Sequence, residues 1–156
     1  MSVKDLLQKR HVPFEVVEHA EAFGAQHVAQ ATHTPGHQVA KSVLLRADHD
    51  YRYFVAVLPA SHMIDFEQLS IFLGGTPLEL ATEIEIAERC PDCEFGVLPP
   101  FGTQYEAQTV VDKSLSEDEF ICFESDCHTR AIRMKFADFY AVEHPLIASF
   151  AKPAQA

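Results

Sequence analysis

The stretch Gly36-His37-Gln38-Val39-Ala40-Lys41-Ser42-Val43-Leu44-Leu45-Arg46 reads as a turn that leads into an apolar segment with one lysine in its middle. Side chains of a strand alternate between two faces, so Lys41 shares a face with Val39, Val43 and Leu45. Neither face has the composition of a solvated surface. Because an unpaired buried ammonium group is costly, we expect Lys41 either to open onto a pocket or to reach water from an edge strand along its methylene stem.

The composition of the 156 residues fits one globular domain that covers residues 1–156. Hydrophobic residues make up 47% of the chain, which is enough for a packed core. The 12 basic and 23 acidic residues give a formal net charge of -11, which argues against non-specific binding to nucleic acid phosphates. The sequence shows no leader and no apolar segment of about 20 residues, so we expect a cytoplasmic protein without a membrane partner. The oligomeric state is left open.

Apolar periodicity and turn residues predict alternating helices and strands. The predicted helices cover residues 3–8, 23–32, 66–72, 83–89 and 136–140, with one more starting at Pro145. The predicted strands cover residues 14–18, 39–45, 51–58, 78–81, 108–111, 120–123 and 130–135. Strands 39–45 and 51–58 are expected to form an antiparallel hairpin through the polar turn 47–50. These elements predict an α+β domain with a largely antiparallel or mixed sheet, curled around a pocket.

The segment Cys90–Gly102 contains too much proline and glycine for regular structure, yet it is too apolar for an ordinary surface loop. Loops of this kind usually line a functional site. We therefore expect this loop to contribute to a pocket.

The four cysteines are expected to be free thiols, since disulfides are rare in a reducing compartment. Cys90 and Cys93 form a C-x-x-C motif that could bind zinc together with Cys122 and Cys127, or act as a redox pair. The spacing of the second pair and the apolar strand around Cys122 argue against zinc. The first pair follows a helix instead of opening one, which argues against redox function. We expect incidental thiols and no metal.

Three segments together resemble the YbaK/EbsC family of aminoacyl-tRNA deacylases, which is related to the editing domain of bacterial prolyl-tRNA synthetase. They are the strand around Lys41, the loop Gly96-Val97-Leu98-Pro99-Pro100-Phe101-Gly102, and Val110-Val111-Asp112. The resemblance extends from about Phe14 to Tyr140. It implies a compact α+β domain whose central mixed sheet is flanked by helices and curves toward a barrel, and it implies no cofactor.

The resemblance also implies a freestanding trans-editing hydrolase that cleaves the ester between a wrong amino acid and the terminal adenosine of tRNA. Lys41 would hold the terminal phosphate or the ester carbonyl, and Gly96 would present its backbone amide near that carbonyl. A preorganised donor at a developing oxyanion is typically worth about 3 kcal/mol. No residue is an obvious general base. The implied partners are the tRNA acceptor end and an aminoacyl-tRNA synthetase that raises the local concentration of substrate.

Further substrate contacts are expected from Pro100, Phe101, His37, Ser125 and His128. Pro100 matches the proline of the family's glycine-x-x-x-proline loop. Phe101 is expected either to stack on the adenine or to fill the core. His37 is expected to close the rim of the pocket, to meet an acidic group, or to lie in an exposed turn.

The chain departs from the family pattern at three places that bear on substrate choice. Pro91-Asp92 stands where many members have threonine and glycine, and Gly96-Val97 stands where many have two glycines. Asp126 replaces a frequent glycine in the turn Ser125-Asp126-Cys127-His128, and aspartate tolerates the left-handed backbone better than most residues.

A non-catalytic binding module is the alternative function. Such a module would keep the same pocket for a small molecule, a nucleotide or a partner protein. The acidic composition favours this alternative, because a tRNA-binding protein gains from basic surface. Lys41 and the loop with Gly96 and Pro100 favour the hydrolase.

Overall fold

The computed structural model describes residues 2–47 and 52–154, so most of the turn expected at 47–50 lies outside the described residues. The helices are α1 (Val3–Lys9), α2 (Ala25–Ala31), α3 (Phe66–Phe72), α4 (Glu83–Arg89), α5 (Lys113–Ser116) and α6 (Phe136–Glu143), with the 3-10 helix η1 (Gly102–Tyr105). The strands are β1 (Glu15–Glu18), β2 (Ala40–Ala47), β3 (Tyr53–Pro59), β4 (His62–Ile64), β5 (Leu78–Leu80), β6 (Gln108–Asp112), β7 (Phe120–Glu124), β8 (Arg130–Lys135), β9 (Leu146–Ala148) and β10 (Ala151–Pro153).

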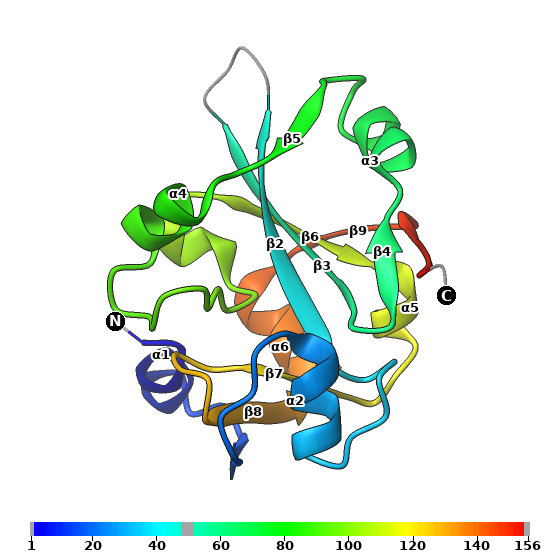
Figure 1. Cartoon of the computed structure of the whole chain (residues 1–156). Helices are drawn as coiled ribbons and strands as arrows, with labels where there is room; N and C mark the ends of the chain where they lie inside the picture. Colours follow the sequence, from blue (N-terminus) through cyan, green and yellow to red (C-terminus); the bar gives the residue numbers. More distant parts are fainter. Residues whose placement is uncertain (1, 48–51, 155–156) are drawn as a thin grey trace.

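The largest sheet is mixed and has the strand order β5-β2-β3-β6-β9. β2 and β3 pair antiparallel from Ala40 opposite Pro59 to Arg46 opposite Tyr53, which confirms the predicted hairpin. β6 runs parallel to β3, and β9 runs parallel to β6. In Figure 1, β2 is the long strand that passes through the molecule from the top to α2, with α4 on one side and α3 on the other.

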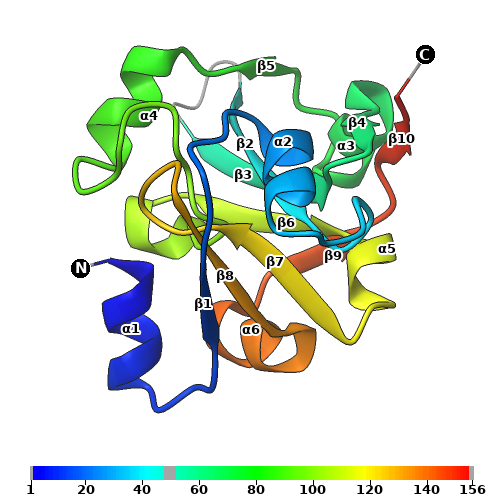
Figure 2. The same ribbon diagram turned by 60° about the horizontal axis from the view of Figure 1, so that its bottom comes forward.

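A second sheet is antiparallel with the order β1-β8-β7, and β4 and β10 form a two-stranded sheet. Figure 2 shows the second sheet with α1 beside β1 and α6 below β8. A single parallel bridge between Val39 and Cys122 connects it to the start of β2. The predicted α+β domain with a mixed sheet and flanking helices is confirmed. The sheet is not closed into a barrel, because β5 and β9 remain separate edges.

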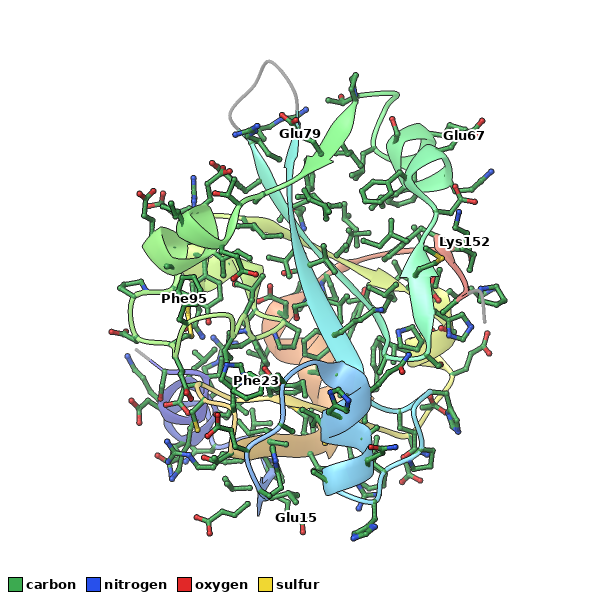
Figure 3. All side chains as sticks on the ribbon, in the orientation of Figure 1. Glu15, Phe23, Glu67, Glu79, Phe95 and Lys152 are labelled. Atoms are coloured by element: carbon green, nitrogen blue, oxygen red, sulfur yellow. A yellow bond between two sulfur atoms is a disulfide. The ribbon has the colours of Figure 1, made fainter. Side chains whose placement is uncertain are left out.

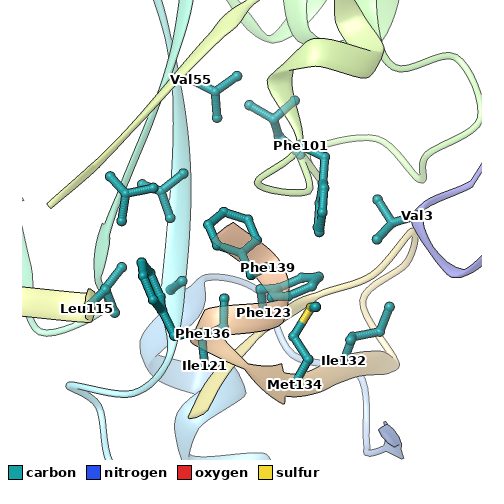
Figure 4. Packing of buried hydrophobic residues seen from close by; sticks show 14 of the residues in the cluster. Val3, Val55, Phe101, Leu115, Ile121, Phe123, Ile132, Met134, Phe136 and Phe139 are labelled. Carbon is teal, nitrogen blue, oxygen red and sulfur yellow. The ribbon is translucent and has the colours of Figure 1, made fainter. Parts of the chain in front are cut away.

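The main hydrophobic core lies between the two larger sheets and is closed by α6. Phe101 is fully buried there, and its ring meets Phe123 of β7 and Phe139 of α6 edge-on at centroid distances of 5.6 and 5.2 Å. Figure 4 shows these rings together with Val55 of β3 and Met134 of β8. Edge-to-face aromatic pairs add to the stability that area burial provides.

Local capping signals determine where three helices begin. The Ser2 hydroxyl accepts a hydrogen bond from the Asp5 amide at the start of α1, and the Asp65 carboxylate accepts one from the Gln68 amide at the start of α3. Thr82 opens α4 with both bonds of a capping box. Each of these helices therefore begins where the sequence predicts it. No helix among the described residues is long and apolar enough to cross a membrane.

The helix predicted from Pro145 is wrong. Residues Leu146–Ala148 form β9, and Val110 of β6 lies opposite Leu146. His144 ends α6 in the left-handed conformation with φ 50°, so the chain turns onto the edge of β6. The short elements β4, α5 and β10 were not predicted. Three or four residues carry too little periodicity to define an element, and pairing with a neighbour decides their structure.

Candidate active site

Lys41 lies in β2 opposite Leu58 of β3. On the edge of β2 that faces away from β3, the described strands pair only near its two ends. Val39, just before β2, forms the bridge to Cys122, and residues Leu45 to Ala47 pair with β5. The side chain is half-buried, and burial lowers the pKa of its ammonium group. Within the described residues, the side chain of Lys41 has no hydrogen-bond or ion-pair partner. Its charge is therefore available to a ligand.

A bridge connects the start of β2, near Lys41, to β7. Val39 lies opposite Cys122 in parallel register, and both belong to the buried cluster that α2 covers with Val28. The bridge is isolated, so the two strands do not pair beyond it, and Glu124, the last residue of β7, pairs instead with Ala131 of β8. Because side chains alternate along a strand, Lys41 lies on the same face of its strand as Val39, and Glu124 lies on the same face of β7 as Cys122.

Gly96 and His128 meet at the end of β7. Gly96 is exposed and has φ 88°, a backbone conformation that glycine adopts readily, and a Cβ atom there would lie 3.8 Å from the imidazole of His128. The His128 ring lies 3.0 Å by its Nε2 from the carbonyl oxygen of Phe95, and its centroid lies 4.5 Å from the ring of Phe23. Figure 3 labels Phe23 and Phe95, which lie on the same side of β2 in this view.

The backbone amide of Gly96 donates no hydrogen bond to any residue that the structure describes. The turn itself is held by the Val97 amide, which donates to the carbonyl of Glu94 at 3.0 Å, and by the Glu94 amide, which donates to the carbonyl of Asp126 at 2.7 Å. The Glu94 carboxylate in addition accepts a hydrogen bond from the His128 amide at 2.9 Å. The turn is therefore fixed, while the amide at its exposed tip is free to donate.

Glu124 and His128 form a buried pair at this site. Glu124 Oε1 lies 3.8 Å from His128 Nδ1, and neither atom has a hydrogen-bond partner. Burial raises the pKa of the Glu124 carboxyl, an effect that the neighbouring His128 counteracts and Glu94 reinforces. Sequence reasoning did not find Glu124, because only the turn between β7 and β8 brings His128 back onto it.

Three of the residues predicted to contact substrate do not present an accessible side chain near Gly96, because two are buried and one lies elsewhere. Phe101 is 0% exposed and fills the core, the second of its two expected roles, and Pro100 beside it is also buried. His37 is exposed, and its Nδ1 lies 3.3 Å from Asp118 Oδ2. Asp118 precedes β7 whereas His128 follows it, so His37 and His128 lie at opposite ends of this strand.

Ser125 is buried beside Glu124 in the turn between β7 and β8. Its backbone amide donates to the carbonyl of Arg130 at 3.1 Å and so helps to close the turn. Of the predicted site residues, Gly96 and His128 are thus neighbours, Ser125 supports the segment that carries His128, and Lys41 lies two residues beyond the bridge that joins its strand to β7.

The expectation of free thiols is wrong for Cys90 and Cys93, which are joined by a disulfide. The chain turns tightly after α4, where the Cys93 amide donates to the carbonyl of Cys90 at 3.1 Å, and the two Cα atoms lie 5.5 Å apart. This separation is within the range of disulfides. Cys122 and Cys127 are free. No group of three metal-binding side chains is present among the described residues.

Solved structures with low sequence identity share this fold. A candidate trans-editing enzyme for prolyl-tRNA synthetase superposes with a TM-score of 0.80 at 20% identity, covering 96% of this chain and 94% of that chain. A protein described only as hypothetical gives a TM-score of 0.86 at 14% identity, covering 96% and 99%. A scaffold protein used for epitope grafting gives a TM-score of 0.82 at 19% identity, covering 96% and 95%. These similarities, at 20% identity or less, show the α+β fold.

The comparison of the sequence with family models identifies the family more specifically than the fold does. The model of the aminoacyl-tRNA editing domain matches residues 19–141, which is most of the chain. The chain belongs to the aminoacyl-tRNA editing domain family. No curated protein shows significant similarity to the sequence.

Proposed function

We propose that this protein is a freestanding trans-editing hydrolase that cleaves the ester of a mischarged aminoacyl-tRNA. The observation that carries the proposal is the unpartnered, half-buried ammonium group of Lys41 in a chain of the editing domain family. A cation held on a central strand without an internal partner is suited to an anionic or strongly polarised ligand group. The terminal phosphate and the ester carbonyl of aminoacyl-tRNA are groups of this kind.

Gly96 supplies the second element of the proposed mechanism. Its amide is exposed and free, and the absence of a side chain lets a substrate approach the backbone closely. An amide aimed at the carbonyl oxygen stabilises the negative charge that develops as a nucleophile adds. Water or a hydroxyl group of the terminal adenosine serves as the nucleophile. The role of the protein is to position the ester and stabilise the charge.

The acidic surroundings of His128 limit how the protein can bind tRNA. The proposed site has three acidic neighbours, Glu94, Glu124 and Asp126. Asp126 Oδ1 forms an ion pair with Arg130 Nη2 at 3.5 Å. These carboxylates repel the phosphate backbone, so we propose that the protein engages only the acceptor end. An aminoacyl-tRNA synthetase bound to the same tRNA would supply the missing affinity through a raised local concentration.

The direct test is hydrolysis of a panel of correctly charged and mischarged tRNAs that carries alanyl, seryl, threonyl and cysteinyl esters. We expect wild type to hydrolyse at least one ester and Lys41→Ala to leave it intact. Lys152→Ala is the matched control, because Lys152 lies exposed on β10, away from β2 (Figure 3). Circular dichroism of all three proteins verifies that they are folded.

If folded wild-type protein leaves every ester intact, the proposed hydrolase function is wrong. Binding of an uncharged acceptor-end oligonucleotide, or of a nucleotide, without hydrolysis would then support the alternative of a binding module. Equal activity in wild type and Lys41→Ala would support the hydrolase function but show that Lys41 has no role in the reaction.

A further inference from the structure

The turn that presents Gly96 is a type II β-turn. The Val97 amide donates to the carbonyl of Glu94 at 3.0 Å, so Phe95 and Gly96 are the two central residues. Gly96 has φ 88°, whereas the φ of Phe95 is not positive. A positive φ at the second central position alone is characteristic of a type II turn.

The direction of the Gly96 amide depends on the peptide group that joins Phe95 to Gly96. This group is trans and planar, so the Phe95 carbonyl and the Gly96 N–H point in opposite directions. A type I turn differs from a type II turn by a rotation of this central peptide group by about 180°. Glycine is compatible with both forms, because it adopts negative and positive φ. A contact outside the turn therefore has to select one of them.

His128 makes a contact that selects the type II form. Its Nε2 lies 3.0 Å from the carbonyl oxygen of Phe95. A carbonyl oxygen only accepts, so this hydrogen bond needs a hydrogen on Nε2, which the imidazolium and one of the two neutral tautomers both carry. In the type I form the Gly96 N–H would face this donor, and the hydrogen bond would be lost. The bond thus keeps the Gly96 N–H directed away from the ring.

The ring of His128 is itself held in place. Its backbone amide donates to the Glu94 carboxylate at 2.9 Å, and its carbonyl accepts from the Ala22 amide at 3.1 Å. The ring lies 4.5 Å from that of Phe23 and is buried. The side chain of Phe95, by contrast, is exposed, so burial of this side chain does not fix the turn (Figure 3). The turn therefore depends on a fixed histidine for its orientation.

We propose that His128 is a positioning residue that sets the direction of the Gly96 amide through the carbonyl of Phe95, without touching the substrate. This inference rests on the proposed hydrolase function, in which the Gly96 amide stabilises charge on the ester carbonyl. A donor that is oriented before the substrate binds needs no reorganisation during the reaction. A hydrogen bond to the carbonyl of the same peptide group also polarises its N–H. His128 thus acts on the chemical step and not on substrate affinity.

The kinetic test compares wild type with His128→Leu and His128→Gln on an ester that wild type hydrolyses. Leucine fills the buried position but has no donor, whereas glutamine offers an amide Nε2 donor. We expect His128→Leu to lower kcat by about tenfold, the usual effect of one hydrogen bond, with KM unchanged. His128→Gln should recover most of the rate. An unchanged kcat in folded His128→Leu would overturn the proposal.

His27 offers a matched control, because it makes the same kind of contact elsewhere. Its Nδ1 lies 2.6 Å from the carbonyl oxygen of Phe23, and the next residue, Gly24, also has φ 88°. We expect His27→Leu to keep the kcat of wild type. Equal slowing by His27→Leu and His128→Leu would overturn the proposal. A raised KM with unchanged kcat in His128→Leu would also overturn it, since that result indicates direct contact with the substrate.

An NMR measurement tests the orientation of the peptide group without substrate. Phenylalanine precedes glycine in Phe23-Gly24, Phe95-Gly96 and Phe101-Gly102. With carbon-13 in the phenylalanine carbonyls and nitrogen-15 in glycine, a carbonyl-to-amide correlation spectrum contains one signal from each pair. His128→Leu should shift the Phe95-Gly96 signal and leave that of Phe101-Gly102 in place, whereas His27→Leu should shift that of Phe23-Gly24. An unmoved Phe95-Gly96 signal in His128→Leu would overturn the proposal.

Failure of the hydrolase function is distinguishable from failure of this inference. If wild type hydrolyses no ester, the hydrolase function is wrong, and the correlation spectrum alone decides whether His128 orients the Gly96 peptide. If His128→Leu does not fold, the ring-nitrogen spectrum of wild type decides, with the signals of His128 identified by their absence in His128→Gln. A hydrogen on Nε2 supports the proposal, and a neutral ring with its hydrogen on Nδ1 overturns it.

Discussion

The Glu143 carboxylate accepts hydrogen bonds from both the hydroxyl and the backbone amide of Thr103, at 2.6 and 3.2 Å. It also accepts one from the Thr109 hydroxyl at 2.5 Å, and that hydroxyl in turn accepts from the Gly102 amide at 2.8 Å. The end of α6 therefore anchors η1, which directly follows the loop that begins at Gly96. The position of the proposed catalytic loop depends on a buried carboxylate that does not itself reach the substrate.

Glu143 gives the first prediction. Burial raises the pKa of its carboxyl more than the hydrogen bonds from Thr103 and Thr109 lower it. The folded state then binds more protons than the unfolded state, so the contribution of this group to stability falls as pH rises from about 4.5 through the folded pKa. We expect the free energy of unfolding of wild type, minus that of Glu143→Gln, to decrease in urea titrations as pH rises above about 4.5. A difference that increases over this range would contradict the assignment, and Glu67→Gln on exposed α3 serves as control.

Asp112 gives a prediction of opposite sign. Burial raises the pKa of Asp112, but hydrogen bonds from Ser114, Phe150 and Ala151 outweigh this effect, and the pKa is lowered. Its stabilisation is then complete above the unfolded pKa of 3.8 and is lost as pH falls through the folded value. Asp112→Asn should cost about 2 kcal/mol near neutral pH, and the cost should shrink in acid. Urea titrations at several pH values measure this, and a cost that does not depend on pH would argue against an ionised Asp112.

Phe101 distinguishes a core role from a contact with the adenine. Phe101→Ala should reduce the free energy of unfolding by about 3–5 kcal/mol, because it leaves a cavity between Phe123 and Phe139. Phe101→Leu should cost less and keep the rate of ester hydrolysis per folded molecule. Urea denaturation and single-turnover hydrolysis measure the two effects. Loss of hydrolysis in a stably folded Phe101→Leu would show that the ring contacts substrate after all.

The cysteines predict a specific labelling pattern. Unfolded protein without reductant should react with a thiol reagent at Cys122 and Cys127 only, and at all four cysteines after reduction. In the folded protein Cys127 should react first. It is half-exposed, and although burial raises its pKa, hydrogen bonds from Thr129 and Arg130 lower it below the usual value, whereas burial covers Cys122 and raises its pKa. Mass spectrometry of the labelled protein counts the modified residues. Four labelled thiols without reductant would rule out the disulfide.

The sequence determined the elements that local interactions define. The capping box of Thr82 and Glu85 fixed α4 at Glu83–Arg89, as predicted, because both bonds connect residues within one helical turn. The hairpin of β2 and β3 followed from two apolar strands that flank a polar turn. The same alternation showed that Lys41 is a charge in an apolar strand, and the structure places it there without a partner.

Only the tertiary structure decided the features that depend on residues far apart in the chain. β9 is a strand because β6 offers it hydrogen bonds, although Leu146–Ala148 alone carries no such signal. Glu124 Oε1 comes to lie 3.8 Å from His128 Nδ1 because the chain turns back after β7, and the ring of His128 also lies against the carbonyl of Phe95, more than 30 residues earlier in the chain. Hydrogen bonds of this range are made only when the chain is packed, so the sequence identified Gly96 and His128 as candidates but could not bring them together with Glu124.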